Sequence, residues 1–145
     1  MRFDTPGTRA LIASAPFGAL GAEQVAASIA RGLVSGGMPD PDVLALDGDT
    51  ADVGKLLAEC DFDARMRAAR AVIIAVQRLR EETLAGSAAF EIATRARQSG
   101  VPSYAITAEN RLDAFDTRIL DLQTILEAEN PRALAAAGRK LAKLL

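Results

Sequence analysis

One short stretch of the sequence fits best inside a parallel β-sheet. Residues 71–76 read AVIIAV, a continuous apolar run rich in β-branched side chains. A strand buried on both faces has this composition, whereas a strand with one wet face alternates apolar and polar residues. We therefore predict a central strand over residues 70–76, around which the remaining elements are arranged.

Four further apolar runs alternate with stretches of helical period, and Gly, Pro, Asp or Asn closes each run. The predicted strands cover residues 9–14, 42–46, 70–76, 103–108 and 120–126. The predicted helices cover residues 22–34, 51–60, 87–99 and 112–118, with a last helix from Pro131 that Asn130 caps. This alternation predicts one three-layer α/β domain over residues 1–145. It has five mainly parallel strands with helices on both faces, in a Rossmann-like or flavodoxin-like fold.

Composition and charge exclude several classes of function. The net charge is -2 and the basic residues are scattered, so no basic patch for nucleic acid is visible. The chain has no histidine and a single cysteine, Cys60, which excludes zinc hydrolases, His-dependent triads and an intramolecular disulfide. The flanking residues AECDFD contain no cation, so we expect Cys60 to be a quiet, partly buried thiol. The apolar stretch Ala10–Ala15 is too short for a secretory or membrane segment. We expect a cytoplasmic protein with no membrane partner.

Two linked segments resemble the glycerate kinase family of bacteria. Residues 73–89 read IIAVQRLREETLAGSAA, and residues 100–106 read GVPSYAI. The family has approximately I-T-G-E-G-R-L-D-x-Q-T-L-A-G-K-A-P and, one helix later, G-V-P-V-I-A, at the same spacing. Residues 19–33 and the segment Phe62–Met66 are similar to the family's first helix and its F-D-E-R-L segment.

The departures from this family concern the residues that phosphoryl transfer would need. Val76, Arg80 and Ser87 stand where the family has Glu, Asp and Lys, and residues 13–18 contain no lysine. The large substrate domain that the family inserts before its F-D-E-R-L segment is missing. Phosphoryl transfer depends on charged groups that position and neutralise phosphate. The resemblance therefore implies a degenerate first domain with no catalytic residues and no metal site, a pseudoenzyme.

Two polar segments remain candidates for ligand binding. Asp47, Gly48 and Asp49 follow the second predicted strand, where they form either a Mg²⁺ site or a plain β-α turn. Gly86 and Ser87 either present backbone N–H groups to a phosphate or simply cap a helix. We favour the turn and the cap, and we expect no cofactor, with a nucleotide or Mg²⁺ as the open alternative.

Apolar side chains lie in the loops that the missing domain would cover in a two-domain relative. They are Pro16, Phe17, Leu20, Leu79 and Leu84. An exposed apolar patch of this kind usually marks an interface. The sequence therefore predicts a homodimer or a complex with another protein through this face.

Three functions fit the sequence to different degrees. The first is a non-catalytic binding or interaction module that resembles a truncated glycerate kinase. The alternative is a residual kinase or other phosphoryl-transfer enzyme that uses Asp47 and the loop at Gly86. A receiver-like regulatory domain is disfavoured, because no acidic pair ends the first strand and no lysine follows the fourth.

Overall fold

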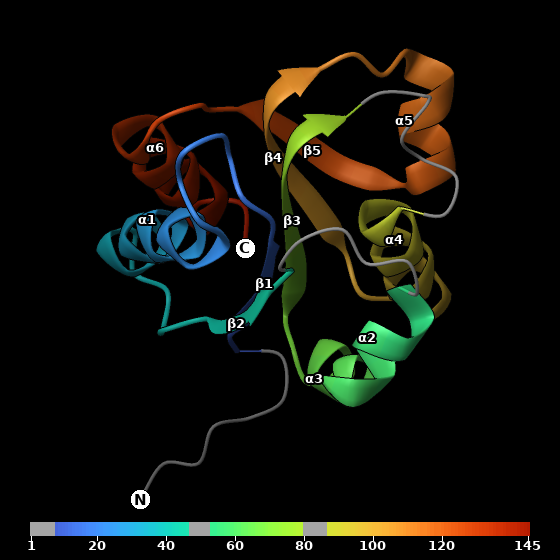
Figure 1. Ribbon diagram of the computed structural model, residues 1–145. Helices are drawn as coiled ribbons and strands as arrows, with labels where there is room; N and C mark the ends of the chain where they lie inside the picture. The colour runs from blue at the N-terminus through green and yellow to red at the C-terminus, as the bar shows by residue number, and fades with distance from the viewer. Residues whose placement is uncertain (1–7, 47–52, 80–86) are drawn as a thin grey trace, which may run out of the picture.

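Five parallel strands form one sheet in the order β2-β1-β3-β4-β5 (Figure 1). The computed structural model describes residues 8–46, 53–79 and 87–145. The strands are β1 Ala10–Ser14, β2 Asp42–Ala45, β3 Ala71–Leu79, β4 Ser103–Asn110 and β5 Leu122–Glu127. This is the flavodoxin-like strand order, so the predicted three-layer α/β fold is confirmed.

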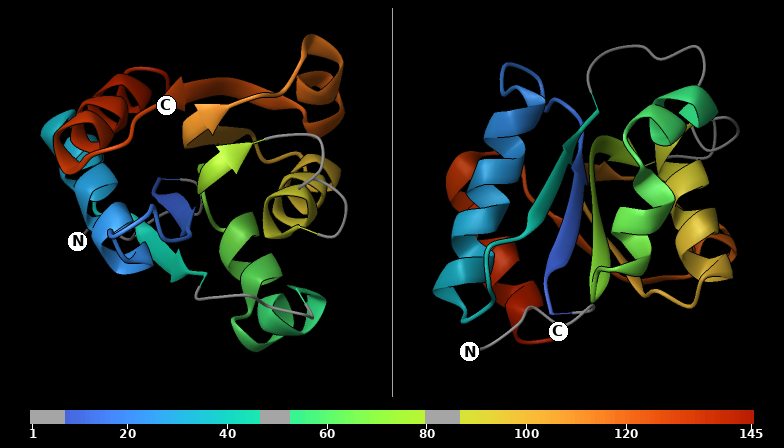
Figure 2. Two further views of the ribbon diagram at one scale, coloured as in Figure 1. Left: turned by 45° about the horizontal axis from the view of Figure 1, so that its top comes forward. Right: turned by 90° about the horizontal axis from the view of Figure 1, so that it is seen from below.

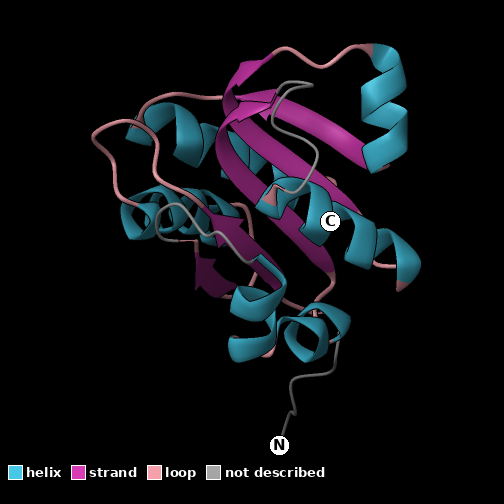
Figure 3. Cartoon of the chain, turned by 45° about the vertical axis from the view of Figure 1, so that its right-hand side comes forward, coloured by secondary structure: helices cyan, strands magenta, loops and turns pink. Residues whose placement is uncertain are grey.

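Helices cover both faces of the sheet (Figures 2 and 3). One face carries α1 Ala22–Ser35 and α6 Pro131–Ala142, which pack against each other. The other face carries α2 Val53–Glu59, α3 Phe62–Arg67, α4 Ala88–Gln98 and α5 Ala114–Leu120. Helices α1 and α6 each follow a strand of the parallel sheet and return the chain antiparallel to it, so the two helices run parallel to each other.

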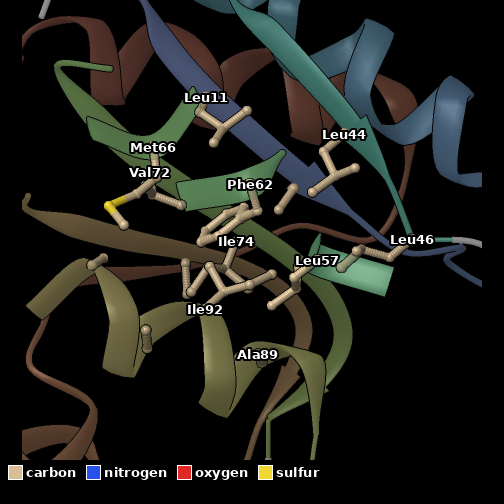
Figure 4. Packing of buried hydrophobic residues seen from close by; sticks show 14 of the residues in the cluster. Leu11, Leu44, Leu46, Leu57, Phe62, Met66, Val72, Ile74, Ala89 and Ile92 are labelled. Atoms are coloured by element: carbon tan, nitrogen blue, oxygen red, sulfur yellow. The ribbon is translucent and has the colours of Figure 1, made fainter. Parts of the chain in front are cut away.

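The core forms two apolar layers, one on each side of the sheet. Successive residues of β1 and β3 point to opposite faces, so Leu11 and Ile74 lie in one layer while Ile12 and Ile73 lie in the other. All four side chains are fully buried. Figure 4 shows the first layer, in which the side chains of α2, α3 and α4 meet those of the strands. The unbroken apolar run of the central strand is thus explained by burial on both faces.

Strands β3 and β4 are longer than predicted, because they continue past the end of β1 as a two-stranded extension. Arg78 pairs with Glu109 and Leu79 with Asn110 in this extension. The prediction stopped at residue 76 because Gln77 and Arg78 are polar. Their side chains are exposed, whereas Leu79 returns to the core.

Helix α3 was not predicted, since its residues were interpreted only through the family resemblance. Phe62 and Met66 are four residues apart, and both are fully buried on the sheet. Asp61 precedes them as the N-cap with a φ of 56°, a left-handed conformation that Asp tolerates better than most residues. The spacing of these two apolar residues, at i and i+4, is the sequence signal for this helix. The other predicted elements are present with boundaries within two residues, where the chain is described.

Arg65 of α3 fixes the edge strand β2. Its Nε and Nη2 atoms donate to the two carboxylate oxygens of Asp42 at 2.9 and 2.8 Å, and Nη2 also donates to the Val43 carbonyl at 2.8 Å. The hydrogen bonds from Arg65 hold the pKa of the Asp42 carboxyl below its usual value. A carbonyl on the sheet edge is thereby satisfied, which reduces the tendency of β2 to pair with another chain.

Candidate functional site

The strand order reverses between β1 and β3, because β2 lies on one side of β1 and the later strands lie on the other. This switch point is where a ligand is first expected. Open α/β sheets bind ligands outside the carboxyl ends of their strands at such a switch point. The loop that joins β1 to α1, residues 15–21, lies there, and the extension of β3 and β4 lies beside it. Of the predicted ligand residues, Ser87 is described, whereas Asp47, Gly48, Asp49 and Gly86 lie outside the described residues.

Hydrogen bonds within the protein occupy five backbone donors of the β1–α1 loop. The N–H of Ala15 donates to the Ala75 carbonyl at 2.8 Å, and Phe17 and Leu20 exchange two hydrogen bonds of 2.9 Å. The N–H groups of Gly18 and Gly21 donate to the side-chain oxygens of Gln77 at 3.1 Å and Gln24 at 2.8 Å. A phosphate-binding loop presents such N–H groups to its ligand instead. The loop is therefore built as a closed turn.

The Gly18–Gln77 hydrogen bond joins the loop to β3 across the switch point. Gly18 has a φ of 55°, a conformation that glycine adopts without strain. This backbone turn directs the Gly18 N–H toward Gln77, whose side-chain amide oxygen accepts the hydrogen bond at the switch point. Sequence analysis did not single out Gln77, because its importance depends on a contact between residues far apart in the chain.

Ser14 ends β1 and is a hydroxyl that the sequence analysis also passed over. It is fully buried, and its Oγ donates to the Ala22 carbonyl at 2.9 Å. A nucleophilic serine needs a neighbouring base that accepts its proton. The Ser14 proton is instead used to hold the start of α1 against β1, so this residue has a structural role.

Ser87 caps α4. Its side-chain oxygen accepts a hydrogen bond from the Phe90 N–H at 3.1 Å, which confirms the N-cap interpretation. Glu91 lies in the first turn of the same helix and pairs with Arg95 at 2.9 Å. A carboxylate at this position complements the helix macrodipole and lowers the attraction of the helix terminus for a second anion.

The extension of β3 and β4 carries a charged cluster whose members pair with one another. Glu109 contacts Arg78 at 3.5 Å and also pairs with Arg111. The buried Thr107 hydroxyl lies 3.0 Å from the Gln77 carbonyl and 3.2 Å from that of Glu109. Two guanidinium groups share one carboxylate in this cluster, so a net positive charge remains on the named side chains.

The expectation that Phe17 and Leu79 face water is wrong. Phe17 is 5% exposed in the layer beneath α1 and α6, and Leu79 is 2% exposed in the opposite layer. The loop turns Phe17 inward, and the longer β3 carries Leu79 back into the core. Pro16 is exposed and Leu20 half-buried, while Leu84 lies outside the described residues. Among the described residues, the large apolar side chains that face water lie elsewhere, at Val34, Val43, Phe115, Ile119 and Leu144.

Cys60 has a cationic neighbour that its sequence context did not reveal. Nη1 of Arg65 donates to the Cys60 carbonyl at 3.2 Å, which is a contact with the backbone and not with the thiol. Across the described ranges, no group of three or more Cys, Asp or Glu residues is placed to hold a metal ion. In the same ranges, no helix is long and apolar enough to span a membrane.

No family model matches the chain, and no curated protein matches it.

Proposed function

We propose that this domain is a non-catalytic interaction module. We further propose that the carboxyl ends of its strands at the β1–β3 switch point do not bind phosphate. The observation that supports it most directly is the engagement of five backbone N–H groups of loop 15–21 within the protein. Phosphate would have to compete with these hydrogen bonds. Each of these intramolecular hydrogen bonds contributes about 1 kcal/mol net, and phosphate would have to replace several of them at once.

The helix termini at this edge support the same proposal. Glu23, Glu91 and Asp116 lie in the first turns of α1, α4 and α5. Negative side chains at these positions are favourable for the helices, but they repel an incoming anion. An enzyme that transfers phosphoryl groups needs cations at the corresponding places.

The resemblance to glycerate kinases remains a prediction, and the proposal is consistent with it. Val76, at the position of the family's Glu, is half-buried and packs against the core below the sheet edge. Ser87, at the position of the family's Lys, is engaged as a helix cap. A domain that descended from such a kinase and kept these residues would retain the fold without its chemistry. The alternative of a residual kinase has no support among the described side chains.

Thermal unfolding with candidate ligands tests the proposal. A ligand at a hundred times its Kd stabilises a protein by about 2.7 kcal/mol, which is roughly 10 °C in Tm for a domain of this size. We expect no shift with Mg-ATP, Mg-ADP or inorganic phosphate, and no ATP consumption with glycerate. Glu23→Gln is the matched variant, because removing a repulsive charge would strengthen a weak phosphate site. A Tm increase in the wild-type protein, or turnover near 1 s⁻¹ as in kinases, would refute the proposal, whereas an increase confined to Glu23→Gln would show that this charge keeps phosphate out.

A further inference from the structure

Helices α1 and α6 lie closer together than side chains normally allow. A Cβ atom at Gly32 would overlap the Ala135 carbonyl oxygen, and one at Gly138 would overlap the Ile29 carbonyl oxygen. Glycine at these two positions lets the helix backbones touch. The two parallel helices therefore form a tight pair on one face of the sheet (Figure 1). We call the line along which they touch the seam, and the helices diverge on either side of it.

A groove of about 680 Å³ follows this seam on the outside of the pair. Small or apolar side chains form its floor: Ala27, Ala30 and Val34 of α1 and Ala135 of α6. Val34 is 45% exposed, which is unusual for a valine on an otherwise well-packed helix. Small floor residues allow the backbone of another element to approach closely.

Two arginines, Arg31 and Arg139, line the groove. Within the described ranges, neither forms an ion pair with a carboxylate, and the one hydrogen bond of the Arg31 side chain goes to Ser28 Oγ at 3.3 Å. Arg139 lies in the last turn of α6, where a cation complements the helix macrodipole. Arg31 lies before the last turn of α1, so the macrodipole does not account for it. Asp40 is the one acidic residue that lines the same groove.

We propose that this groove binds an acidic amphipathic helix of a partner protein, which lies antiparallel to α1 and α6. A groove between two parallel helices accepts the apolar stripe of a third helix, the usual helix-in-groove mode of recognition. Its carboxylates lie opposite Arg31 and Arg139, which outnumber Asp40, the one acidic residue of the lining.

The orientation follows from the helix macrodipoles. The negative ends of α1 and α6 lie at the same end of the groove, toward which Arg31 and Arg139 are placed. An antiparallel partner brings its positive N-terminus to this end, and acidic residues are favoured in that first turn. The partner's acidic turn and the two arginines therefore coincide. Because α1 has 14 residues and spans about 21 Å, the contact is small, and we expect weak, micromolar binding.

This inference rests on the proposed function, since it names the partner class of an interaction module. The two fail separately because the groove lies on a helical face and the phosphate question concerns the sheet edge. Phosphate binding would refute the proposed function alone, and the experiment below would refute the groove alone.

Fluorescence anisotropy with the full chain and a synthetic peptide tests the inference. The probe is a labelled helical peptide with a Leu/Ala stripe and glutamates in its first half, and its control peptide has lysines in place of the glutamates. We expect the acidic peptide to bind and the basic one not to bind. Arg31→Glu and Arg139→Glu should each weaken binding about tenfold, more at low salt than at high salt.

Matched variants separate the groove from net charge. Arg132→Glu makes the same charge change on the exposed start of α6, outside the groove lining, and should leave binding within about twofold. Ala27→Trp fills the groove without changing charge and should abolish binding. Tm values confirm that each variant is folded.

Four results would overturn the inference: no binding of the acidic peptide, equal binding of both peptides, unchanged binding by Arg31→Glu, or equally strong binding of single-stranded DNA. Light scattering of the protein alone supplies a fifth arm. A dimer that Arg31→Glu dissociates would assign the groove to a second copy of this chain and would also overturn it.

Discussion

Replacing Gly32 by alanine is expected to destabilise the domain by forcing α1 and α6 apart. The added Cβ would overlap the carbonyl oxygen of Ala135 and would come within 2.8 Å of the Arg139 nitrogen, and both atoms belong to the backbone of α6. A flexible side chain cannot relieve this contact, so a whole helix must shift. Overpacking of this kind costs about 1–3 kcal/mol. Because backbone atoms are involved, we take the upper value.

Helix propensity opposes this cost, since alanine is favoured over glycine in a helix by about 1 kcal/mol. The net loss is therefore about 2 kcal/mol, which corresponds to roughly 6–8 °C in Tm for a domain of this size. The assay is urea unfolding followed by circular dichroism, with a thermal melt as a second measurement. Gly21→Ala is the control, because the nearest atom to its added Cβ is the Gln24 Oε1 at 3.8 Å. It should lose less than about 1 kcal/mol. Unchanged or raised stability in Gly32→Ala would show that the two helices do not touch as described.

Three further changes test other parts of the structure. Arg65→Met should destabilise the domain by about 1–2 kcal/mol in urea unfolding, because it removes a paired and hydrogen-bonded guanidinium that is only partly exposed. No loss of stability would mean that the Arg65–Asp42 pair is not formed. The folded-state pKa of Asp42 is lowered, so its contribution is present above the unfolded pKa of about 3.9 and is lost as pH falls through the folded value. The stability difference between wild type and Asp42→Asn should therefore shrink below about pH 4, and a difference independent of pH would contradict this. Ser87→Ala should lower the free energy of unfolding by about 1 kcal/mol, because the α4 cap is lost. Ser87→Thr is the control that should be tolerated, and equal losses of stability in both variants would refute the cap.

The parts of the fold that depend on local sequence were predictable. The run at residues 71–76 identified the central strand, and Asn130 with Pro131 identified the start of α6, whose cap accepts from the Ala133 N–H at 2.8 Å. These signals belong to single elements, because burial of a strand and capping of a helix are set by a few adjacent residues.

The surface of the domain was not predictable in the same way. The exposure of Phe17 was misjudged because a loop residue becomes buried only when α1 and α6 are placed above it. The groove depends on α1 and α6 being neighbours, although about a hundred residues separate Arg31 from Arg139 in the chain. Only the strand order, with β2 at one edge and β5 at the other, brings the two helices to one face. Sequence periodicity gives the inward face of each helix but not the identity of its neighbour.

Amide chemical shifts of the β1–α1 loop test the central claim most directly. In a ¹⁵N-labelled sample, the N–H groups of Gly18 and Gly21 report on whether the donors of this loop meet a ligand, because each donates to a glutamine side chain in the free protein. On titration with Mg-ATP and with inorganic phosphate, the proposed function predicts that both resonances stay in place. A saturable shift of either resonance would show that the loop opens to bind phosphate, and it would contradict the proposal that this edge of the sheet is closed to such ligands.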